Sequence, residues 1–541
     1  MISSVHRWID DNILELGREM RLSYLPPLMV YMAAGISGLT AIVGTFFIKE
    51  YLDLSAEFLA TLGFWANIPW SLKMPFGHLV DLIWRWKSWL VFLGAGLIAV
   101  SLLIMAGLLT DREAMTAIMP AGAWFVLSTL LAPVGYMMQD SVADAMTVEA
   151  VPHVDDQGAP YDPATLKLMH TTMQTLGRVA IIGGTVLVAL INLYVFSQAD
   201  MSVEAGKAAV YRDIYLMALT IPLISVAGIA VAVYVKHRQK QRLLAGGMGH
   251  EEIRKIQMQV VQKTMPNWWI LGGGLAFVIF TLAMGFSDYV YNQEIILTGS
   301  LAIVVFLIAR LTRELAPDAR NTLIGTAVII FVFRAVPATG PGVTWWMIDV
   351  LGFDEAFFSV LSLIASTLTL AGMFIFRRFM AERSIAYVVG ALTIAGTVLA
   401  LPTLGMYYGM HEWTAAHTGG MVDARFITLV NTALESPLGQ IAMIPMLAWI
   451  AHSAPANLKA TYFAVMASFT NLALSLAQLG TKYLNQVFIV TREVKDATTQ
   501  AVHLPADYSQ LGDIIIAAIL IGFVAPFAAI LIMRFSRQKW A

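Results

Sequence analysis

The chain has 541 residues, of which 58 % are hydrophobic and 13 % are charged, and its mean hydropathy is +0.70. A soluble protein of this length carries about a quarter charged residues because its surface faces water, so the composition excludes a soluble fold. The net charge of −2 gives no reason to expect nucleic acid as a partner. The absence of cysteine excludes disulfides, thiolate metal sites and cysteine nucleophiles.

The chain begins with a charged segment, residues 1–24, that has no continuous apolar run. Ile9, Ile13, Leu16 and Met20 recur there at helical spacing. This pattern predicts a helix lying on the membrane surface, with an ordinary solvated helix as the alternative.

Apolar runs long enough to cross a hydrocarbon core of about 30 Å follow one another along the rest of the chain. They lie at about 25–48, 58–80, 88–110, 117–148, 166–197, 211–235, 267–287, 293–312, 321–346, 356–376, 384–408, 424–452, 459–489 and 510–533. We therefore predict an all-α polytopic membrane protein with about 14 transmembrane helices embedded in the lipid bilayer.

The polar connections indicate how the chain crosses the membrane. When both termini are assigned to the cytoplasm, most loop lysines and arginines fall on the same side, and the largest group lies between Lys236 and Lys263. Cytoplasmic loops of membrane proteins carry this excess of basic residues. We expect both termini in the cytoplasm, and the inner membrane as the location if the source is bacterial.

The first and second halves of the chain resemble each other in sequence. Residues 45–58, TFFIKEYLDLSAEF, are similar to residues 344–357, TWWMIDVLGFDEAF, and Pro133-Val-Gly135 recurs as Pro437-Leu-Gly439. Internal repeats of this kind are typical of secondary transporters, which bind substrate at the interface between repeats. The sequence contains no GxxxxGK[ST] phosphate-binding loop, so we do not expect a nucleotide-driven pump. We expect a transporter and not an enzyme, and we expect no cofactor.

The repeat and the segments outside it divide the chain into five parts. We expect an interfacial helix at 1–24, a six-helix bundle at 25–236, a basic cytoplasmic linker at 237–266, two extra transmembrane helices at 267–312, and a second six-helix bundle with a short tail at 321–541.

The connection after the second span carries a recognisable motif. Gly77, Asp81 and Arg85 have the spacing G-x-x-x-D-x-x-x-R, which resembles the signature of the major facilitator superfamily. This resemblance implies a fold of two pseudo-symmetric six-helix bundles. It also implies that the three residues form a gate or latch at the inner helix ends.

Further motifs resemble the folate–biopterin transporter group of that superfamily. They are Pro69-Trp70 with Lys73, the stretch 140–149, and the stretches 436–445 and 468–471. The resemblance implies a folate- or pterin-like substrate. Gln139-Asp140 with Asp144-Ala145 is equally similar to bacterial muropeptide permeases, so a muropeptide-like solute is the alternative.

Charged side chains within spans need an explanation because each costs about 2.5–3.5 kcal/mol at the bilayer centre. Asp140 and Asp144 lie on one face of the fourth span, at depths of roughly 14 and 8 Å from its inner end. Lys73, His170 and Arg178 fall at roughly 12, 6 and 18 Å on neighbouring spans. We predict that Asp140, Asp144 and His170 couple transport to protons, the alternative being a static salt-bridge brace.

The second half has its own charged residues near the midplane. Arg334 lies roughly 21 Å into its span, and Pro337, Gly340 and Pro341 after it should break the helix. Arg178 and Arg334 are predicted to bind an anionic substrate from opposite halves, since arginine binds carboxylate and phosphate bidentately. Glu435 is a third candidate in the same region. The alternative is that Glu435 pairs with Arg334 and neither contacts substrate.

Two more residues complete the predicted substrate site. Trp70 could stack on a flat heterocycle, and Lys73 lies one turn further along the same span. Most other aromatic residues are expected to face lipid or the membrane interfaces. The outer-loop histidines match no metal-binding spacing, so no metal site is predicted.

Together these features predict a secondary active transporter of a small organic anion that works by alternating access and is driven by protons. A muropeptide-like solute carrier is one alternative, and a non-transporting assembly protein on the same fold is another. Polar residues at the midplane favour transport, because a scaffold needs none there. We expect no obligatory oligomer.

Overall fold

The computed structural model describes residues 15–52, 54–152, 154, 159, 161–198, 204–247, 249–251, 266–287, 289–314, 317–376, 383–438, 459–495 and 502–536. Within these residues the fold is helical apart from one antiparallel hairpin of β1 (Val494–Lys495) and β2 (Val502–Leu504). Ten helices in the described part are long and apolar enough to cross a membrane.

The first half of the chain forms spans that are partly broken. Its elements are α2 (Glu15–Arg18), η2 (Leu22–Tyr24), α3 (Leu25–Ile36), η3 (Ser37–Thr40), α4 (Ala41–Tyr51), α5 (Ala56–Ser71), α6 (Lys73–Leu82), η4 (Trp84–Trp86), α7 (Ser88–Thr110), α8 (Arg112–Ile118), α9 (Ala121–Ala150), α10 (Pro163–Gln198), α11 (Glu204–Ala218) and α12 (Thr220–Ala245). The predicted linker starts at residue 237, but α12 continues to Ala245, because its polar segment keeps helical geometry beyond the apolar run. Residues 252–265 of that linker and the first part of the predicted interfacial helix lie outside the described residues.

The second half follows two intervening helices, α14 (Trp268–Gly285) and α15 (Asn292–Leu311), and the short η5 (Thr312–Glu314). Its elements are α16 (Pro317–Arg334), α17 (Gly342–Asp349), α18 (Glu355–Ile375), α20 (Ile385–Tyr407), α21 (Met410–His417), α22 (Ala424–Glu435), η6 (Ser436–Leu438), α24 (Lys459–Val487) and α25 (Leu511–Phe535). The predicted break after Arg334 is confirmed, since α16 ends at that residue. The remainder of the span that begins with α22 lies outside the described residues.

Local sequence explains where several helices begin. Ser55, Asn267, Asp354, Ser384 and Asp423 each precede a helix, and each side chain accepts a hydrogen bond from a backbone N–H of the first turn. These N-caps satisfy donors that have no partner within the helix. They fix the start of α5, α14, α18, α20 and α22.

Glycines allow helices of the first half to approach closely. A Cβ at Gly94 of α7 would lie 2.6 Å from the carbonyl oxygen of Gly135 in α9, and the reverse distance is also 2.6 Å. Gly35 of α3 and Gly184 of α10 form a second such contact. Small residues at helix interfaces are a common means of packing in membranes, where lipid gives helices no hydrophobic reason to associate.

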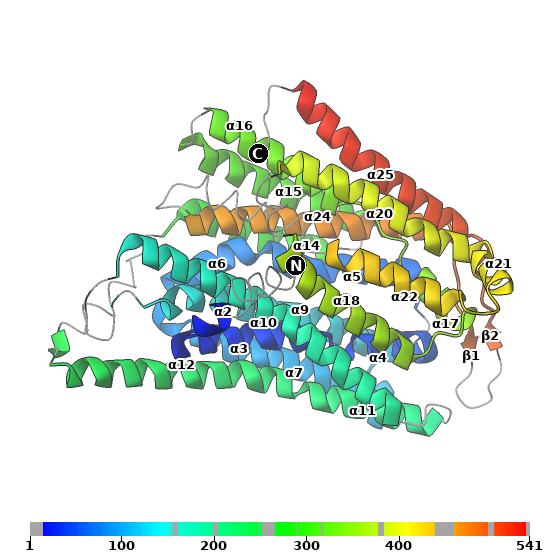
Figure 1. Cartoon of the computed structure of the whole chain (residues 1–541), viewed down its shortest axis with the longest axis horizontal. Coiled ribbons are helices and arrows are strands. Elements are labelled where there is room, and N and C mark those ends of the chain that lie inside the picture. The colour runs from blue at the N-terminus through cyan, green and yellow to red at the C-terminus, as the bar shows by residue number, and fades with distance from the viewer. Residues whose placement is uncertain are drawn as a thin grey trace, which may run out of the picture.

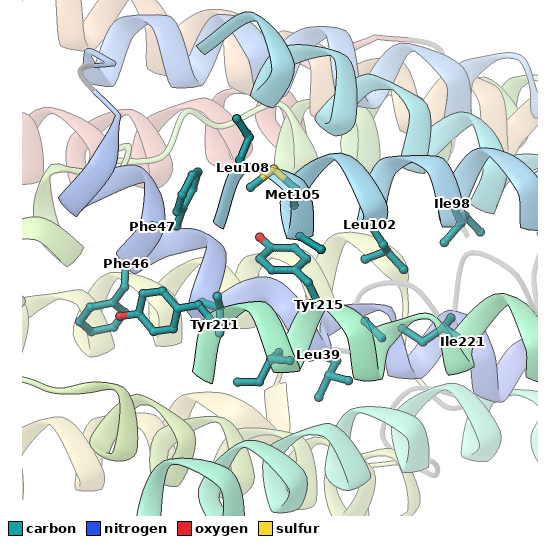
Figure 2. Close-up of a cluster of buried hydrophobic side chains, with 14 of the residues drawn as sticks. Leu39, Phe46, Phe47, Ile98, Leu102, Met105, Leu108, Tyr211, Tyr215 and Ile221 are labelled. Atoms are coloured by element: carbon teal, nitrogen blue, oxygen red, sulfur yellow. The ribbon is translucent and has the colours of Figure 1, made fainter. Parts of the chain in front are cut away.

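The apolar core of the first half lies between α4, α7 and α11. Figure 2 shows Phe46, Leu102, Met105 and Tyr215 directed into this cluster. The two halves meet mainly where α5 packs along α24 and α10 packs along α18. The extra helices do not separate the halves, because α14 packs on α6 and α15 on α24.

The hairpin marks one end of the bundle, which we call the hairpin end. Figure 1 shows β1 and β2 at this end together with α17 and α21, whereas α6 extends toward the opposite end. The elements that mark the hairpin end belong to the second half of the chain, and α4 of the first half contacts β1 there.

Candidate functional site

A lysine lies between two carboxylates in the interior of the first half. Lys73 Nζ is 2.5 Å from Asp140 Oδ2 and 2.8 Å from Asp144 Oδ2. Lys73 begins α6, and the two aspartates project from one face of α9 because they are four residues apart. The side chain of Asp140 is 17 % exposed and that of Asp144 is 47 % exposed. One carboxylate is therefore largely shielded and the other is accessible.

Tyr31 of α3 completes this cluster. Its hydroxyl donates to Asp144 Oδ1 at 2.6 Å, and the residue is buried. Asp144 therefore has two partners, Lys73 and Tyr31, from two different helices, whereas Asp140 pairs with Lys73. Nothing in the sequence singled out Tyr31, because the first span contains no charged residue that would place a polar partner there.

Helix α10 carries two of the predicted residues, Arg178 and His170, and between them Gln174. Arg178 is near enough to interact electrostatically with Asp140 and Tyr31. Gln174 donates to Thr147 Oγ1 of α9 at 3.2 Å. His170 lies one turn before Gln174 on α10 and is half-buried. Arg178 and Gln174 therefore lie close to polar residues of the carboxylate-bearing helix α9.

Arg334 and Glu435 lie at helix ends in the second half. Arg334 is the last residue of α16 and is half-buried, and Glu435 is the last residue of α22 and is exposed. Neither forms an ion pair with a residue that the structure describes. Their common role in binding an anion stays a prediction.

Trp70 and Lys73 flank a break in the second span. Helix α5 ends at Ser71 and α6 starts at Lys73, and proline at positions 69 and 75 interrupts the helical hydrogen bonds. Asn471 Nδ2 of α24 donates to the carbonyl oxygen of Trp70 at 3.0 Å, and Met74 N donates to Ser468 Oγ at 3.0 Å. The second half therefore satisfies backbone groups that the break leaves free.

An ion pair that was not predicted lies just after the predicted gate motif. Lys87 Nζ lies 2.6 Å from Glu149 Oε1, and Lys236 Nζ lies 3.2 Å from Glu149 Oε2. Burial lowers the pKa of Lys87, and the neighbouring Glu149 opposes that shift. Asp81 is half-buried and close enough to Lys87 for an electrostatic interaction, whereas Arg85 is exposed.

Gly77 lies in α6 with open space where a Cβ would be, so crowding gives no reason for glycine there. Glu149 had been part of the 140–149 motif but was not predicted as a site residue. Its helical spacing from Asp140 gave no sign that it would reach Lys87, because that contact depends on how α9 packs against the loop before α7.

Polar contacts join the two halves at the hairpin end. Lys49 Nζ lies 2.5 Å from Asp349 Oδ1, and Tyr211 donates to Glu355 Oε1 at 2.6 Å. Arg492 donates to the carbonyl oxygens of Lys49 at 3.0 Å and Leu54 at 2.5 Å. Each contact crosses from the first half to the second, so this end of the molecule is closed.

Tyr508, just before α25, reinforces this closure. Its hydroxyl donates to Asp349 Oδ2 at 2.5 Å, and burial together with this hydrogen bond raises its pKa. Asp349 therefore accepts from the first half and from the segment after the hairpin. Within the part of the chain that the structure describes, no group of three or more His, Asp or Glu side chains could hold a metal ion.

The comparisons with known proteins agree with this architecture. Residues 271–539 match the model of the BT1 family. The folate-biopterin transporter of Synechocystis sp. (strain ATCC 27184 / PCC 6803 / Kazusa) is 21 % identical over 471 residues, which cover 86 % of this chain and 75 % of that protein.

Solved transporter structures share the fold. A POT family transporter in complex with 5-aminolevulinic acid superposes with a TM-score of 0.56 at 12 % identity, covering 95 % of this chain and 96 % of that one. The xylose transporter XylE from E. coli gives 0.50 at 16 % identity, covering 96 % and 97 %. The predicted family resemblance is confirmed, and the protein is not an enzyme. The chain is a multi-pass integral membrane transporter with the all-helical fold of the major facilitator type, and its second half, residues 271–539, is similar to the BT1 family.

Proposed function

We propose that the protein is a proton-coupled secondary transporter of a small organic anion related to folates or pterins. The observation that carries this proposal is the cluster of Lys73 with Asp140 and Asp144. Protonation of either carboxylate removes its attraction to Lys73. Because the side chain of Asp144 is 47 % exposed, a proton can reach the cluster there. His170 is proposed as a proton donor or acceptor on the adjoining helix.

The break between α5 and α6 supplies the mechanical link. Lys73 starts α6, and the hydrogen bonds from Ser468 and Asn471 attach the same break to the second half. Relative motion of the halves would disturb these bonds and move Lys73 with respect to Asp140. A change in protonation and a change in conformation thus act on the same segment, as alternating access requires.

The proposed substrate class rests on the chemistry of the predicted site residues and on the similarity to the Synechocystis protein. Arg178 and Arg334 offer guanidinium groups to a carboxylate, Lys73 offers an ammonium group, and Trp70 offers an aromatic face. Glu435 is proposed as a polar contact at the same level. The Synechocystis protein is named as a folate-biopterin transporter, which supports a pterin-like solute over a muropeptide-like one.

We further propose the complete architecture of about 14 spans, with bundles at 25–236 and 321–541, the extra pair at 267–312 and both termini in the cytoplasm. In this orientation the hairpin end faces outward, so the structure represents a state closed to the outside. Gly77, Asp81 and Arg85 then act as an inner latch. Reporter fusions after Asp213 should report outside and those after Gly246 inside; the reverse pair of results would refute the orientation.

Uptake into proteoliposomes tests the function. Radiolabelled folate, biopterin and a muropeptide should be compared with and without an inward pH gradient. Asp140→Asn and Asp144→Asn should retain substrate exchange but lose uptake driven by the gradient, because only the titratable proton is removed. Asp111→Asn is the matched control, since Asp111 caps α8 outside the spans. Gradient-driven uptake by both cluster variants would refute proton coupling here.

Binding tests the anion site separately. Arg178→Gln or Arg334→Gln should weaken substrate binding by about 2 kcal/mol or more, which is roughly 30-fold. Arg310→Gln is the control, because Arg310 is exposed and stacks over Trp269 at 4.5 Å on the extra pair. Unchanged affinity in both site variants, measured by isothermal titration calorimetry, would exclude the proposed anion contacts.

A further inference from the structure

A pocket at the hairpin end lies where the two halves and the extra helices meet. It has a volume of about 390 Å³. Helix α5 contributes one wall with Glu57, Phe58, Thr61 and Trp65, the first turn of α15 contributes a second, and Lys482 of α24 contributes a third. No residue of the proposed transport site lines it.

The polar groups of this pocket are held in place by hydrogen bonds. Lys482 Nζ donates to Gln293 Oε1 at 3.2 Å, and Gln293 Nε2 donates to the carbonyl oxygen of Thr61 at 3.4 Å. Gln486 donates to Glu57 Oε1 at 2.5 Å. Lys482 Nζ also lies 3.8 Å from Glu294 Oε1 in the first turn of α15, so the cation and the carboxylate that line the pocket, Lys482 and Glu57, are both held in fixed positions.

The pocket lies at the level of the membrane interface. Phe286, Tyr289 and Tyr291, in the connection from α14 to α15, are strongly exposed. Exposed aromatic residues next to a helix end are typical of the headgroup region of a bilayer. The α5 wall, from Ser55 to Trp65, is about 15 Å long at 1.5 Å per residue. This length reaches from the headgroup region into the upper acyl chains.

Exposed Phe58 shows that the α5 wall reaches the lipid-facing surface. An occupant can therefore enter from the bilayer with its apolar part beside Phe58 and Trp65. Its polar part would meet Lys482, which favours an anion and is held only loosely, at 3.8 Å, by Glu294 of α15. Glu57 favours a cation. The chemistry that fits is a zwitterion with a phosphodiester and an amine.

We propose that this pocket binds a phospholipid headgroup that joins a phosphodiester to a primary ammonium, as in phosphatidylethanolamine. The phosphate lies at Lys482 and the ammonium at Glu57. A primary ammonium donates hydrogen bonds to a carboxylate, whereas a quaternary choline group cannot and instead needs several aromatic faces around it. Because the pocket touches α5 and α24, a bound lipid also holds the halves together at the hairpin end.

Native mass spectrometry and thermal unfolding of the purified full-length protein test the proposal. Short-chain phosphatidylethanolamine, phosphatidylcholine and phosphatidylglycerol are the lipid probes, and free phosphoethanolamine and inorganic phosphate are the soluble ones. We expect at least tenfold tighter retention of phosphatidylethanolamine than of the other two lipids. Competition by phosphoethanolamine, with no retention of any lipid, would overturn the assignment to a membrane lipid.

Variants locate the effect in the pocket. Lys482→Gln should weaken phosphatidylethanolamine retention about tenfold, and Glu57→Gln should remove its preference over phosphatidylglycerol. Thr61→Phe fills the pocket without changing a charge and should also abolish retention, which keeps the test valid if Lys482→Gln fails to fold. Arg310→Gln, at the other end of α15, is the matched control and should retain the lipid. Equal retention by wild type, Glu57→Gln and Thr61→Phe would refute the site.

Discussion

Replacement of Lys73 by methionine tests whether the charged cluster is as tightly coupled as its distances indicate. Lys73→Met leaves Asp140, whose side chain is 17 % exposed, without the ammonium 2.5 Å away. Breaking a buried pair by removing one partner costs about 3–5 kcal/mol. Asp144 is 47 % exposed and keeps its hydrogen bond from Tyr31, so losing the ion pair between Lys73 and Asp144 should add about 1 kcal/mol or less. We expect a total destabilisation of about 3–5 kcal/mol, toward the lower end if Asp140 takes up a proton.

A second substitution predicts the direction of a further change in stability. Adding Asp140→Asn to Lys73→Met removes the unpaired carboxylate, so the double variant should be more stable than Lys73→Met alone by about 1–3 kcal/mol. Asp140→Asn alone should cost less than Lys73→Met, because Lys73 still has Asp144 at 2.8 Å. Denaturant unfolding of the four proteins in detergent micelles measures the cycle. If the double variant is less stable than Lys73→Met, the proposed pairing is refuted.

Three further outcomes are expected. Gly135→Val should cost about 1–3 kcal/mol in thermal unfolding because its side chain collides with the backbone of α7, whereas Gly96→Ala meets nothing within 4 Å and should be neutral or stabilising; equal effects would contradict the close packing. Tyr211→Phe leaves buried Glu355 without this donor and should open the hairpin end, seen as faster labelling of a cysteine introduced on α17. Asn471→Ala should slow transport more than it lowers affinity, because the carbonyl at the α5–α6 break loses its donor; an altered dissociation constant with normal turnover would count against this.

Several parts of this molecule follow from sequence because they depend on local physics. Long apolar runs predict the helices, and the helix break after Arg334 follows from Pro337 and Pro341. The spacing of Asp140 and Asp144 places them on one helical face, and depth arguments placed Lys73 beside them. The structure places Lys73 between these two carboxylates.

The residues that complete each cluster were decided only by the tertiary structure. Tyr31 reaches Asp144 because α3 packs closely against α10, through contacts such as Gly35 against Gly184. Glu149 reaches Lys87, and Arg492 reaches backbone carbonyls of the first half more than 400 residues earlier in the chain. Helical periodicity gives the face on which a side chain lies, but not the rotation and tilt of that helix relative to its neighbours. Those are set by which small residues permit close approach between helices, so the partners of a charge inside the membrane are fixed only when the helices pack.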